Sequence, residues 1–531
     1  MHKLKLKNLF IVLVILIIII CSTYLLKKES ISKKVVCKDC NIVLIDIDCL
    51  RADHLGCYGY PKNTSLNIDK FAKNSILFKK FFSESSLTLP SRMSVYSSLY
   101  PHVHRIKHLA RTNENKEKAT KLNSLMLPKI LSKNNYSNVL IVPSEEIAAI
   151  HSNLGEEFEY VSESKYNQLF DWKDNYWYDG LEWIKNNKDK KFFVSFFSSR
   201  VHEPYTPKEE NLYKFINRTD IKPLSYNELE EILIEKIINK PNKFLKYGFV
   251  KNDSKLFSNK TLLRNSFKDE YSNDSIQHLG WDLSIDEEFF SRFKRGNSYD
   301  WDLIMAFYDS EVYEADQEFN KIIETLKREE LLNKTIIILY SDHGDEFGEH
   351  GNYSHGEHLY DESIHAPLII FIPGMESKEI NALAQGVDIM PTILDLVGIK
   401  TSKHAQGKSL LPIIKDEKED IRKYAFSEGL SNLFSIRSKE WKYITDFKSK
   451  EELYNLKQDP GEKENLISTE PDITYKMKEK LEEHLKTFEN ISVNKKKLNT
   501  KIVKKVLITL IFLLIVIVIL PKKYFKIKIK K

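Results

Sequence analysis

Hydrophobic residues in the middle of the chain form unbroken runs instead of alternating with polar ones. The runs are rich in β-branched and aromatic residues and cover Asn41–Ile45, Phe192–Phe197, Thr335–Tyr340 and Pro367–Phe371. Such runs are typical of strands that are buried on both faces, as in a mostly parallel sheet. Helical spacing lies between them, over Leu66–Asn74, Ser124–Lys133, Trp301–Lys327 and Val387–Val397. This alternation predicts an α/β fold with helices flanking the sheet.

The pattern changes after about residue 415. Short strand-like segments near Phe434, Trp441 and Glu452 precede an amphipathic helix over Ile473–Phe488. They predict a small C-terminal α+β subdomain over residues 416–492, after a main domain over residues 35–415. Residues 208–300 lack strong periodicity. We expect them to form a partly helical insertion that acts as a lid or a substrate wall.

Two apolar runs lie near the ends, Leu9–Leu26 and Val506–Leu520. The first approaches the length of a membrane-spanning helix and lacks the small-residue cleavage site of a signal peptide. The second is short enough for a buried or interfacial helix, but its flanking lysines favour a membrane. We predict a transmembrane anchor in residues 1–34 and another in residues 493–531. Both termini would then lie in the cytoplasm, with the catalytic domain on the extracytoplasmic side.

Charge is distributed unevenly along the 531 residues. Segments 1–34 and 495–531 carry +6 and +12, which leaves −12 for residues 35–494 out of a total of +6. An acidic middle argues against a nucleic-acid partner. Five cysteines are too few for a disulfide-built scaffold. The pair Cys37 and Cys40 is expected to be incidental, or a disulfide if the domain is exported.

Polar residues follow three of the predicted strands. They are Asp48 after the first, His202 after the second, and Asp342 with His343 after the third. Ligands of such sheets bind outside the carboxyl ends of the strands. Carboxylate and imidazole groups suit Mg²⁺, Mn²⁺, Ca²⁺ or Zn²⁺. We therefore expect a metal site at this edge of the sheet.

A second group of polar residues is Thr88-Leu-Pro-Ser-Arg92. Pro90 suits the first turn of a helix that runs to about Leu99, so Thr88 would lie at a helix N-terminus, where an anion is favoured. Arg92 adds a permanent cation. A hydroxyl on a metal beside an anion pocket is an arrangement for attack on a phosphate or sulfate ester. A helix cap is an equally consistent role for Thr88.

Histidines supply the remaining candidates for proton transfer to a leaving group. They are His202, His355 and His358. The segment Ser354–His358 could hold a second metal instead.

Several segments, taken in order over residues 41–466, resemble the sulfatase family of the alkaline phosphatase superfamily. They are Asp48–Tyr60, Thr88–Arg92 with Leu99–His102, His202–Tyr205, Ser341–Gly351 with Leu359–Ser363, Val387–Gly398 and Glu452–Glu462. The resemblance implies an alkaline-phosphatase-like sheet. It implies one divalent metal ion (Ca²⁺, Mg²⁺ or Mn²⁺) held by Asp48, Thr88, Asp342 and His343. It also implies that Arg92, His202 and His355 contact the ester.

The chain departs from this family in three places. Sulfatases carry Cys or Ser at the position of Thr88, because that residue is oxidised to formylglycine, and threonine cannot form that aldehyde. A Gly-Lys-Trp-His-type segment is missing after Tyr136, and Cys49 replaces a frequent second Asp. The threonine resembles relatives that transfer phosphoethanolamine or phosphoglycerol at membrane surfaces. A threonine ester needs a second in-line attack on its central atom, which phosphoryl groups undergo readily.

These observations lead to three hypotheses. The first is a membrane-anchored, metal-dependent hydrolase or transferase that uses Thr88 on a phosphate ester or phosphodiester, with a glycan or lipid headgroup as the partner. The second is a sulfatase that acts on a sulfated glycan or aryl sulfate without formylglycine. The third is an inactive module that binds an anion. The intact set of Asp48, Thr88, Asp342 and His343 favours an active enzyme.

Overall fold

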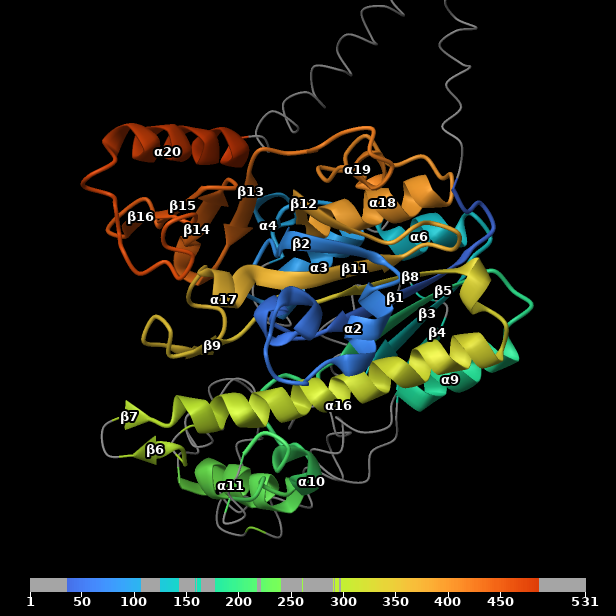
Figure 1. Ribbon diagram of the computed structural model, residues 1–531, viewed down its shortest axis with the longest axis horizontal. Coiled ribbons are helices and arrows are strands. Elements are labelled where there is room, and N and C mark those ends of the chain that lie inside the picture. The colour runs from blue at the N-terminus through green and yellow to red at the C-terminus, as the bar shows by residue number, and fades with distance from the viewer. Residues whose placement is uncertain are drawn as a thin grey trace, which may run out of the picture.

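An eight-stranded sheet forms the centre of the molecule. The computed structural model describes residues 36–106, 125–142, 160–163, 177–216, 221–239 and 298–486, with residues 158, 260, 290 and 292–295. The strand order is β12-β2-β11-β8-β1-β5-β3-β4 (Figure 1). The strands are β1 (Asn41–Ile47), β2 (Ile76–Phe82), β3 (Ser137–Val142), β4 (Tyr160–Glu163), β5 (Phe192–Ser198), β8 (Thr335–Tyr340), β11 (His365–Phe371) and β12 (Lys378–Gln385).

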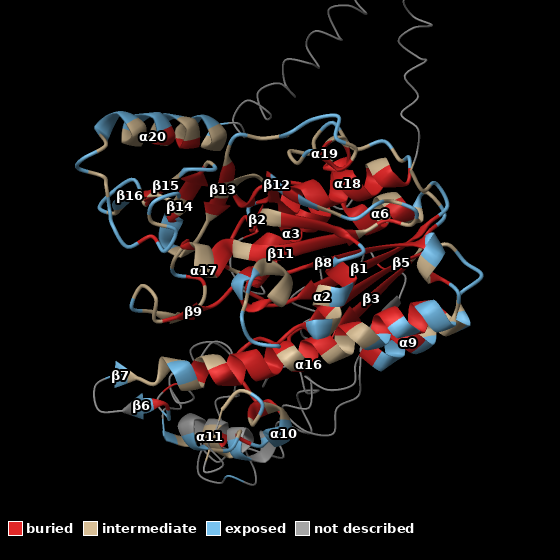
Figure 2. Ribbon diagram, in the orientation of Figure 1, coloured by how far each residue is buried: buried red, intermediate tan, exposed pale blue. Residues whose placement is uncertain are grey.

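Strand direction confirms the predicted α/β class with a mostly parallel sheet. β11 runs antiparallel to its neighbours β2 and β8, and the other neighbouring pairs in this sheet are parallel. The unbroken apolar runs are explained by burial on both faces. In β1, Ile42 and Leu44 pack into one hydrophobic cluster, whereas Val43 and Ile45 pack into another on the opposite face. Figure 2 shows the buried sheet between two helical layers.

Helices cover both faces of the sheet. One face packs against α3 (Thr88–Ser97), α6 (Leu127–Ser132) and α18 (Ile389–Leu396). The other face packs against α2 (Leu66–Ala72), α9 (Trp177–Asn186) and α16 (Trp301–Arg328). Shorter elements complete this body: α4 (Pro101–His104), α17 (Asp361–Ile364), α19 (Leu411–Ile414), and the strand pair β9 (Glu346–Phe347) with β10 (Tyr353–Ser354).

The C-terminal part forms a four-stranded antiparallel sheet with one helix packed on it. The strands are β13 (Ala425–Glu428), β14 (Phe434–Arg437), β15 (Trp441–Thr445) and β16 (Glu451–Asn455). Helix α20 (Pro471–Leu485) packs against β14 and β15 through Met477 and Leu481. This arrangement has the α+β character that the sequence predicts for this region.

The predicted insertion is described only in part. It includes α10 (Glu209–Leu212), α11 (Tyr226–Asn239), and the strand pair β6 (Lys294–Arg295) and β7 (Ser298–Tyr299). In Figure 1 these elements lie beside α16, on the side away from the sheet. A role as lid or substrate wall remains a prediction.

The prediction of a transmembrane helix at each end requires correction. Among the described residues, no helix combines the length and the apolar composition needed to cross a bilayer. Helix α16 spans 28 residues, but exposed charged side chains such as Lys321, Glu324 and Lys327 line one side of it. The predicted localisation depended on two spanning helices and loses its support with them. The apolar runs Leu9–Leu26 and Val506–Leu520 lie outside the described residues.

Candidate active site

The carboxyl ends of β1, β5 and β8 deliver polar side chains to one edge of the sheet. Asp46 lies opposite Tyr340, and Ile47 lies opposite Ser198. The residues that follow these three strands therefore emerge side by side. Ser341 joins two of the loops, because its Oγ accepts a hydrogen bond from the backbone N–H of Leu50 (3.0 Å) and donates to the carbonyl of His343 (2.7 Å).

The four predicted metal ligands lie together at this edge. The Oγ1 atom of Thr88 is 3.2 Å from Nε2 of His343. The same nitrogen is 3.5 Å from Oδ1 of Asp48 and 3.9 Å from Oδ2 of Asp342. All four residues are buried, and Thr88 is the first residue of α3. The structure thus brings together residues that are up to 295 positions apart in the chain.

This group fits a divalent cation. The Nδ1 atom of His343 lies 2.9 Å from the carbonyl of Gly344 and donates to it, which leaves the Nε2 lone pair facing Thr88. One carboxylate oxygen of Asp48 and one of Asp342 are buried without a hydrogen-bond partner. Burial raises the pKa of both carboxyl groups, and the charge of Asp342 raises that of Asp48 further. A bound cation would relieve both costs.

Arg92 lies behind Thr88, one turn further along α3. Its Nε is 3.0 Å from Oδ2 of Asp46, and its guanidinium carbon lies 4.0 Å from the ring centroid of Phe197. Asp46 also accepts a hydrogen bond from the hydroxyl of Tyr340 (2.9 Å). The guanidinium therefore balances the buried charge of Asp46, and its proposed contact with an ester remains a prediction.

The two predicted catalytic histidines lie beside the metal-ligand group. The rings of His343 and His355 have centroids 4.5 Å apart, and those of His202 and His355 are 5.0 Å apart. The Nδ1 atom of His355 is 3.4 Å from Oδ1 of Asp345 and 3.6 Å from Oε1 of Glu203. His355 thus lies among acids, next to the proposed cation.

The two histidines differ in charge. Burial opposes a charge on His355, but Glu203, Asp345 and Asp48 together raise its pKa to about 10. Burial instead lowers the pKa of His202 to about 4, and its Nδ1 donates to the carbonyl of Glu203 (2.6 Å). In the metal-free chain at neutral pH, His355 is therefore a cation and His202 is neutral.

Sequence reasoning did not assign Glu203, Asp345 or Cys49 to the site. Each directly follows or lies two residues after an assigned residue, which is the signal that could have found them. Cys49 Sγ is 3.5 Å from Oδ1 of Asp48 and 3.7 Å from Nδ1 of His355. His358 lies apart from this group, because its Nδ1 contacts Oε2 of Glu346 (2.9 Å). His358 therefore lies outside the group that contains His202 and His355, and a second metal held by the segment Ser354–His358 stays a prediction.

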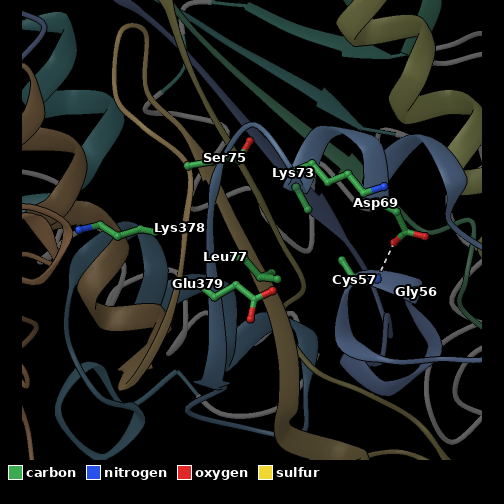
Figure 3. Close-up of a pocket in the computed structure, with 10 residues that line it drawn as sticks. Gly56, Cys57, Asp69, Lys73, Ser75, Leu77, Lys378 and Glu379 are labelled. Atoms are coloured by element: carbon green, nitrogen blue, oxygen red, sulfur yellow. Dashed lines mark hydrogen bonds between the residues drawn. The ribbon is translucent and has the colours of Figure 1, made fainter.

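A cavity of about 550 Å³ lies elsewhere, beside the amino ends of β2 and β12 (Figure 3). Its lining includes Ser75 and Lys378, which precede and begin these strands, together with Cys57 and Asp69. Asp69 accepts a hydrogen bond from the backbone N–H of Cys57 (2.7 Å). None of the predicted site residues lines this cavity. It opens at the opposite edge of the sheet from Thr88, so we do not assign the ester site to it.

Two models of known protein families match this chain. The family model for sulfatases matches residues 40–399. The model described as N-sulphoglucosamine sulphohydrolase, C-terminal, matches residues 348–489. The sheet with its flanking helices is an α/β fold of the alkaline phosphatase type, with buried acids at the ends of its strands. Within that class, the chain belongs to the sulfatase family, as its motifs predict, and is a sulfatase-family hydrolase.

Individual relatives have low sequence identity to this chain. An N-acetylglucosamine-6-O-sulfatase of Bacteroides thetaiotaomicron is 22% identical over 474 residues, which cover 80% of this chain and 82% of that protein. Arylsulfatase K of Mus musculus is 31% identical over 194 residues, covering 34% of this chain and 35% of that protein. The match to arylsulfatase K therefore spans about a third of that relative.

Two solved structures share the fold. One, solved in complex with its substrate D-glucosamine-2-N,6-O-disulfate, has a TM-score of 0.62 at 21% identity, and the match covers 85% of this chain and 99% of that one. The other is a phosphonate monoester hydrolase of Agrobacterium radiobacter, with a TM-score of 0.59 at 19% identity, covering 83% and 94%. Both likenesses concern the fold.

Proposed function

We propose that this hydrolase cleaves a sulfate ester on an amino-sugar glycan, with Thr88 as the nucleophile. One observation carries the proposal: Oγ1 of Thr88 lies 3.2 Å from Nε2 of His343, in a buried group with Asp48 and Asp342. The choice of ester rests on the relatives, among which are an N-acetylglucosamine-6-O-sulfatase and a protein whose substrate is a disulfated glucosamine. We therefore favour a sulfate ester as the substrate over the phosphate ester that we expected from the sequence.

Asp48, Asp342, His343 and Thr88 would hold the metal ion. Such a cation, when bound, lowers the pKa of the hydroxyl and neutralises charge that develops on the ester. Ca²⁺, Mg²⁺ and Mn²⁺ all accept carboxylate oxygens, so the donor set leaves the choice among them open.

Thr88 requires a route without formylglycine. Its oxygen would attack the sulfur, forming an Oγ1–S bond while the S–O bond to the sugar breaks, and the sugar hydroxyl takes up the proton that Thr88 loses. Water would then attack the same sulfur, which releases sulfate and restores Thr88. The position of Thr88 at the start of a ten-residue helix favours an anion beside it.

His355 would provide the positive charge that faces the ester. Its proton is retained at neutral pH because Glu203, Asp345 and Asp48 surround it. His202 would offer Nε2 as a hydrogen-bond acceptor to a sugar hydroxyl, since its Nδ1 proton is already donated to the carbonyl of Glu203. These two histidines would bind the ester in the absence of the Lys and His of the Gly-Lys-Trp-His-type segment, which this chain lacks.

A second candidate function is hydrolysis of a phosphate or phosphonate ester. Thr88 itself favours it, because a threonine ester of phosphorus undergoes a second displacement more readily than one of sulfur. The fold shared with a phosphonate monoester hydrolase is consistent with this chemistry.

Turnover of matched esters tests the proposal. The full chain, supplied with Ca²⁺, Mg²⁺ or Mn²⁺, would be assayed with p-nitrophenyl sulfate, N-acetylglucosamine 6-sulfate, p-nitrophenyl phosphate and p-nitrophenyl phenylphosphonate. We expect the largest kcat/KM with the sulfated sugar. Turnover restricted to phosphorus esters would favour the second candidate. Binding of the sulfated sugar with no turnover of any ester would favour an inactive anion-binding module.

Mass spectrometry of the Thr88 peptide tests the nucleophile. Sulfo and phospho adducts have nearly the same mass, so substrate labelled with a heavy sulfur isotope would be used for trapping. A labelled adduct on Thr88 is expected, whereas turnover without any adduct on Thr88 or its peptide would contradict covalent catalysis by this residue.

A further inference from the structure

Cys49 joins two groups of potential metal ligands. It follows Asp48 directly, and its backbone has φ of 60°, in the left-handed region that few non-glycine residues adopt. Its Sγ lies 3.5 Å from Oδ1 of Asp48 on one side and 3.7 Å from Nδ1 of His355 on the other. The thiol therefore lies between the metal ligands described above and a second group formed by His202, Glu203 and His355.

The second group has the composition of a site for a borderline-soft metal. Sulfur from Cys49, one nitrogen each from His202 and His355, and an oxygen from Glu203 all lie within 4.8 Å of one another. Cys49, His202 and Glu203 are buried, and the side chain of His355 is 12% exposed. Thiolate, imidazole and carboxylate together are ligands of Zn²⁺, whereas Ca²⁺ and Mg²⁺ prefer oxygen alone.

The separations within this group match those of ligands around one metal ion. The Nδ1 atom of His355 is 3.6 Å from Oε1 of Glu203, which is longer than an N–H···O hydrogen bond of about 2.7–3.2 Å. The same nitrogen is 3.7 Å from Sγ of Cys49, a length that a hydrogen bond to sulfur also allows. Ligands at the corners of a tetrahedron around Zn²⁺ are about 3.3–3.6 Å apart, given Zn–N near 2.0 Å and Zn–S near 2.3 Å.

The carboxylate of Glu203 independently indicates a bound cation, because one of its oxygens lacks a hydrogen-bond partner among the residues that the structure describes. Its side chain is buried, and Ser354 donates a hydrogen bond to its Oε1 (2.5 Å). Its Oε2 has no hydrogen-bond partner and lies 3.5 Å from Nδ1 of His202. A buried carboxylate oxygen without a hydrogen bond is costly, and a cation would remove that cost.

We propose that Cys49, His202, Glu203 and His355 form a second metal site that binds Zn²⁺ or a similar transition-metal ion. On binding, the Cys49–metal bond replaces the S–H bond, the bond from the metal to His355 replaces an N–H bond of its protonated ring, and both protons pass to solvent. The sulfur of Cys49 also lies within 4.8 Å of ligand atoms of Asp48 and His343, but the group with His202, Glu203 and His355 adds two nitrogens and a carboxylate oxygen to it. The site would be distinct from the one at Asp342 and His343, and adjacent to it.

The site gives a role to the missing residues of the family pattern, and this part of the inference rests on the proposed function. The chain lacks the Lys and His of the Gly-Lys-Trp-His-type segment. A second cation at Cys49 would supply positive charge beside the ester in place of the proton on His355, and His202 would then hold the metal instead of a sugar hydroxyl. Such a cation would stabilise the oxygen of the leaving sugar, as in two-metal sites.

Cobalt binding without substrate tests the site. The full chain, freed of metal with a chelator, would be titrated with Co²⁺ alone while thiolate-to-cobalt charge-transfer absorbance in the near ultraviolet is recorded. We expect a saturable band that Zn²⁺ displaces. Cys49→Ser should abolish this band, and Glu203→Gln should lower the Co²⁺ affinity by at least about tenfold.

Matched variants separate this site from other thiols and from the first metal. Cys57→Ser should keep the band, because Cys57 lies in the cavity at the opposite edge of the sheet. Asp342→Asn should also keep it while removing the first metal and the ester turnover. Circular dichroism would verify folding, and if Cys49→Ser fails to fold, Glu203→Gln carries the test.

Three results would overturn the proposal: no band in the parent chain, an unchanged band in Cys49→Ser, or an unchanged Co²⁺ affinity in folded Glu203→Gln. Because no ester is present, these outcomes do not depend on whether the enzyme is a sulfatase. Conversely, sulfate turnover that persists in a chain without the cobalt band would leave the proposed function intact.

Discussion

Arg92 and Asp46 form an ion pair in which neither side chain reaches solvent, with Nε of Arg92 3.0 Å from Oδ2 of Asp46. The pair connects the helix that begins at Thr88 to the strand that leads to Asp48. Burial and the charge of Asp342 raise the pKa of Asp46, and the Arg92 guanidinium opposes that rise. The ion pair should therefore affect both the free energy of unfolding and the balance of buried charge next to the metal ligands.

Loss of one partner of this pair should be strongly destabilising. We expect Arg92→Met to lower the free energy of unfolding by about 3–5 kcal/mol, because it leaves Asp46 buried beside Asp342 without a compensating charge. Urea denaturation at neutral pH measures the change, with the exposed Arg328→Met as the matched control. Adding Asp46→Asn should recover part of the loss, and a double variant as unstable as the sum of both single changes would contradict a coupled pair.

Metal removal should affect both activity and stability. We expect a chelator to lower turnover by more than about 100-fold, since loss of even outer-shell partners costs about 10–100-fold. Added Ca²⁺, Mg²⁺ or Mn²⁺ should restore activity and raise the midpoint of thermal unfolding in proportion to the logarithm of its concentration. Asp342→Asn should remove that thermal shift, whereas Asp420→Asn at the surface should keep it. Full activity in the chelator would refute a metal-dependent reaction.

Substitutions of Thr88 distinguish a nucleophile from a helix cap. Thr88→Ala should reduce kcat by on the order of 10⁴–10⁶-fold, as for other nucleophiles, whereas a lost cap would cost only about 1 kcal/mol of stability. Thr88→Ser keeps the hydroxyl and should retain measurable turnover. A Thr88→Ala enzyme with near-parental kcat would exclude the covalent route.

Thr88→Cys offers a separate experiment. Produced together with an enzyme that forms formylglycine, this variant should gain the aldehyde, detectable by mass spectrometry. Its turnover of sulfate relative to phosphate should then rise, because the aldehyde hydrate releases sulfate without a second attack on sulfur. An aldehyde-bearing variant with an unchanged ratio would argue against threonine as the limit on sulfate chemistry.

The buried histidine His104 should make the protein sensitive to acid. Burial lowers its pKa to about 3, and its ring bonds to the carbonyl of Pro90 (3.2 Å) and to the N–H of Ile106 (3.0 Å). Below its ordinary pKa near 6.5, the unfolded chain takes up a proton that the folded chain does not. The free energy of unfolding should therefore fall as the pH drops from about 6.5 towards 3.

Comparison of variants isolates this contribution. His104→Gln should reduce the difference in the free energy of unfolding between pH 7 and pH 5, as measured by urea denaturation. His404→Gln, at a partly buried position outside the core clusters, serves as the control and should leave that difference unchanged. An equal pH dependence in parent and His104→Gln would contradict the role of His104.

Much of the sheet could be predicted because its central strands are buried on both faces. β1, β5 and β8 were found from unbroken apolar runs. β2 was not predicted, because Lys79 and Lys80 interrupt its apolar residues, and β12 was not predicted, because polar residues occupy much of Lys378–Gln385. The antiparallel direction of β11 has no local signal in the sequence.

The residues of the site also divide into those that the sequence predicted and those that it did not. Asp48, Asp342 and His343 come just after strands, so the rule that ligands bind outside the carboxyl ends of such strands predicted that they would meet. Glu203 and Asp345 belong to the site because the loop after β8 folds back over the loop after β5, with the Tyr205 hydroxyl donating to Asp345. The closeness of Glu203 and Asp345 to assigned residues in the sequence is a signal for each of them separately. Their approach to each other depends on tertiary packing between residues 140 positions apart, which a single sequence does not reveal.

The position of β1 between β5 and β8 has a consequence for synthesis on the ribosome. β1 is completed at residue 47, but its neighbours begin only at residues 192 and 335. During translation this apolar strand emerges well before either partner, and such unpaired edges invite aggregation. Shielding of the nascent N-terminal third by a chaperone would therefore matter more for this protein than for one whose first strands pair with each other.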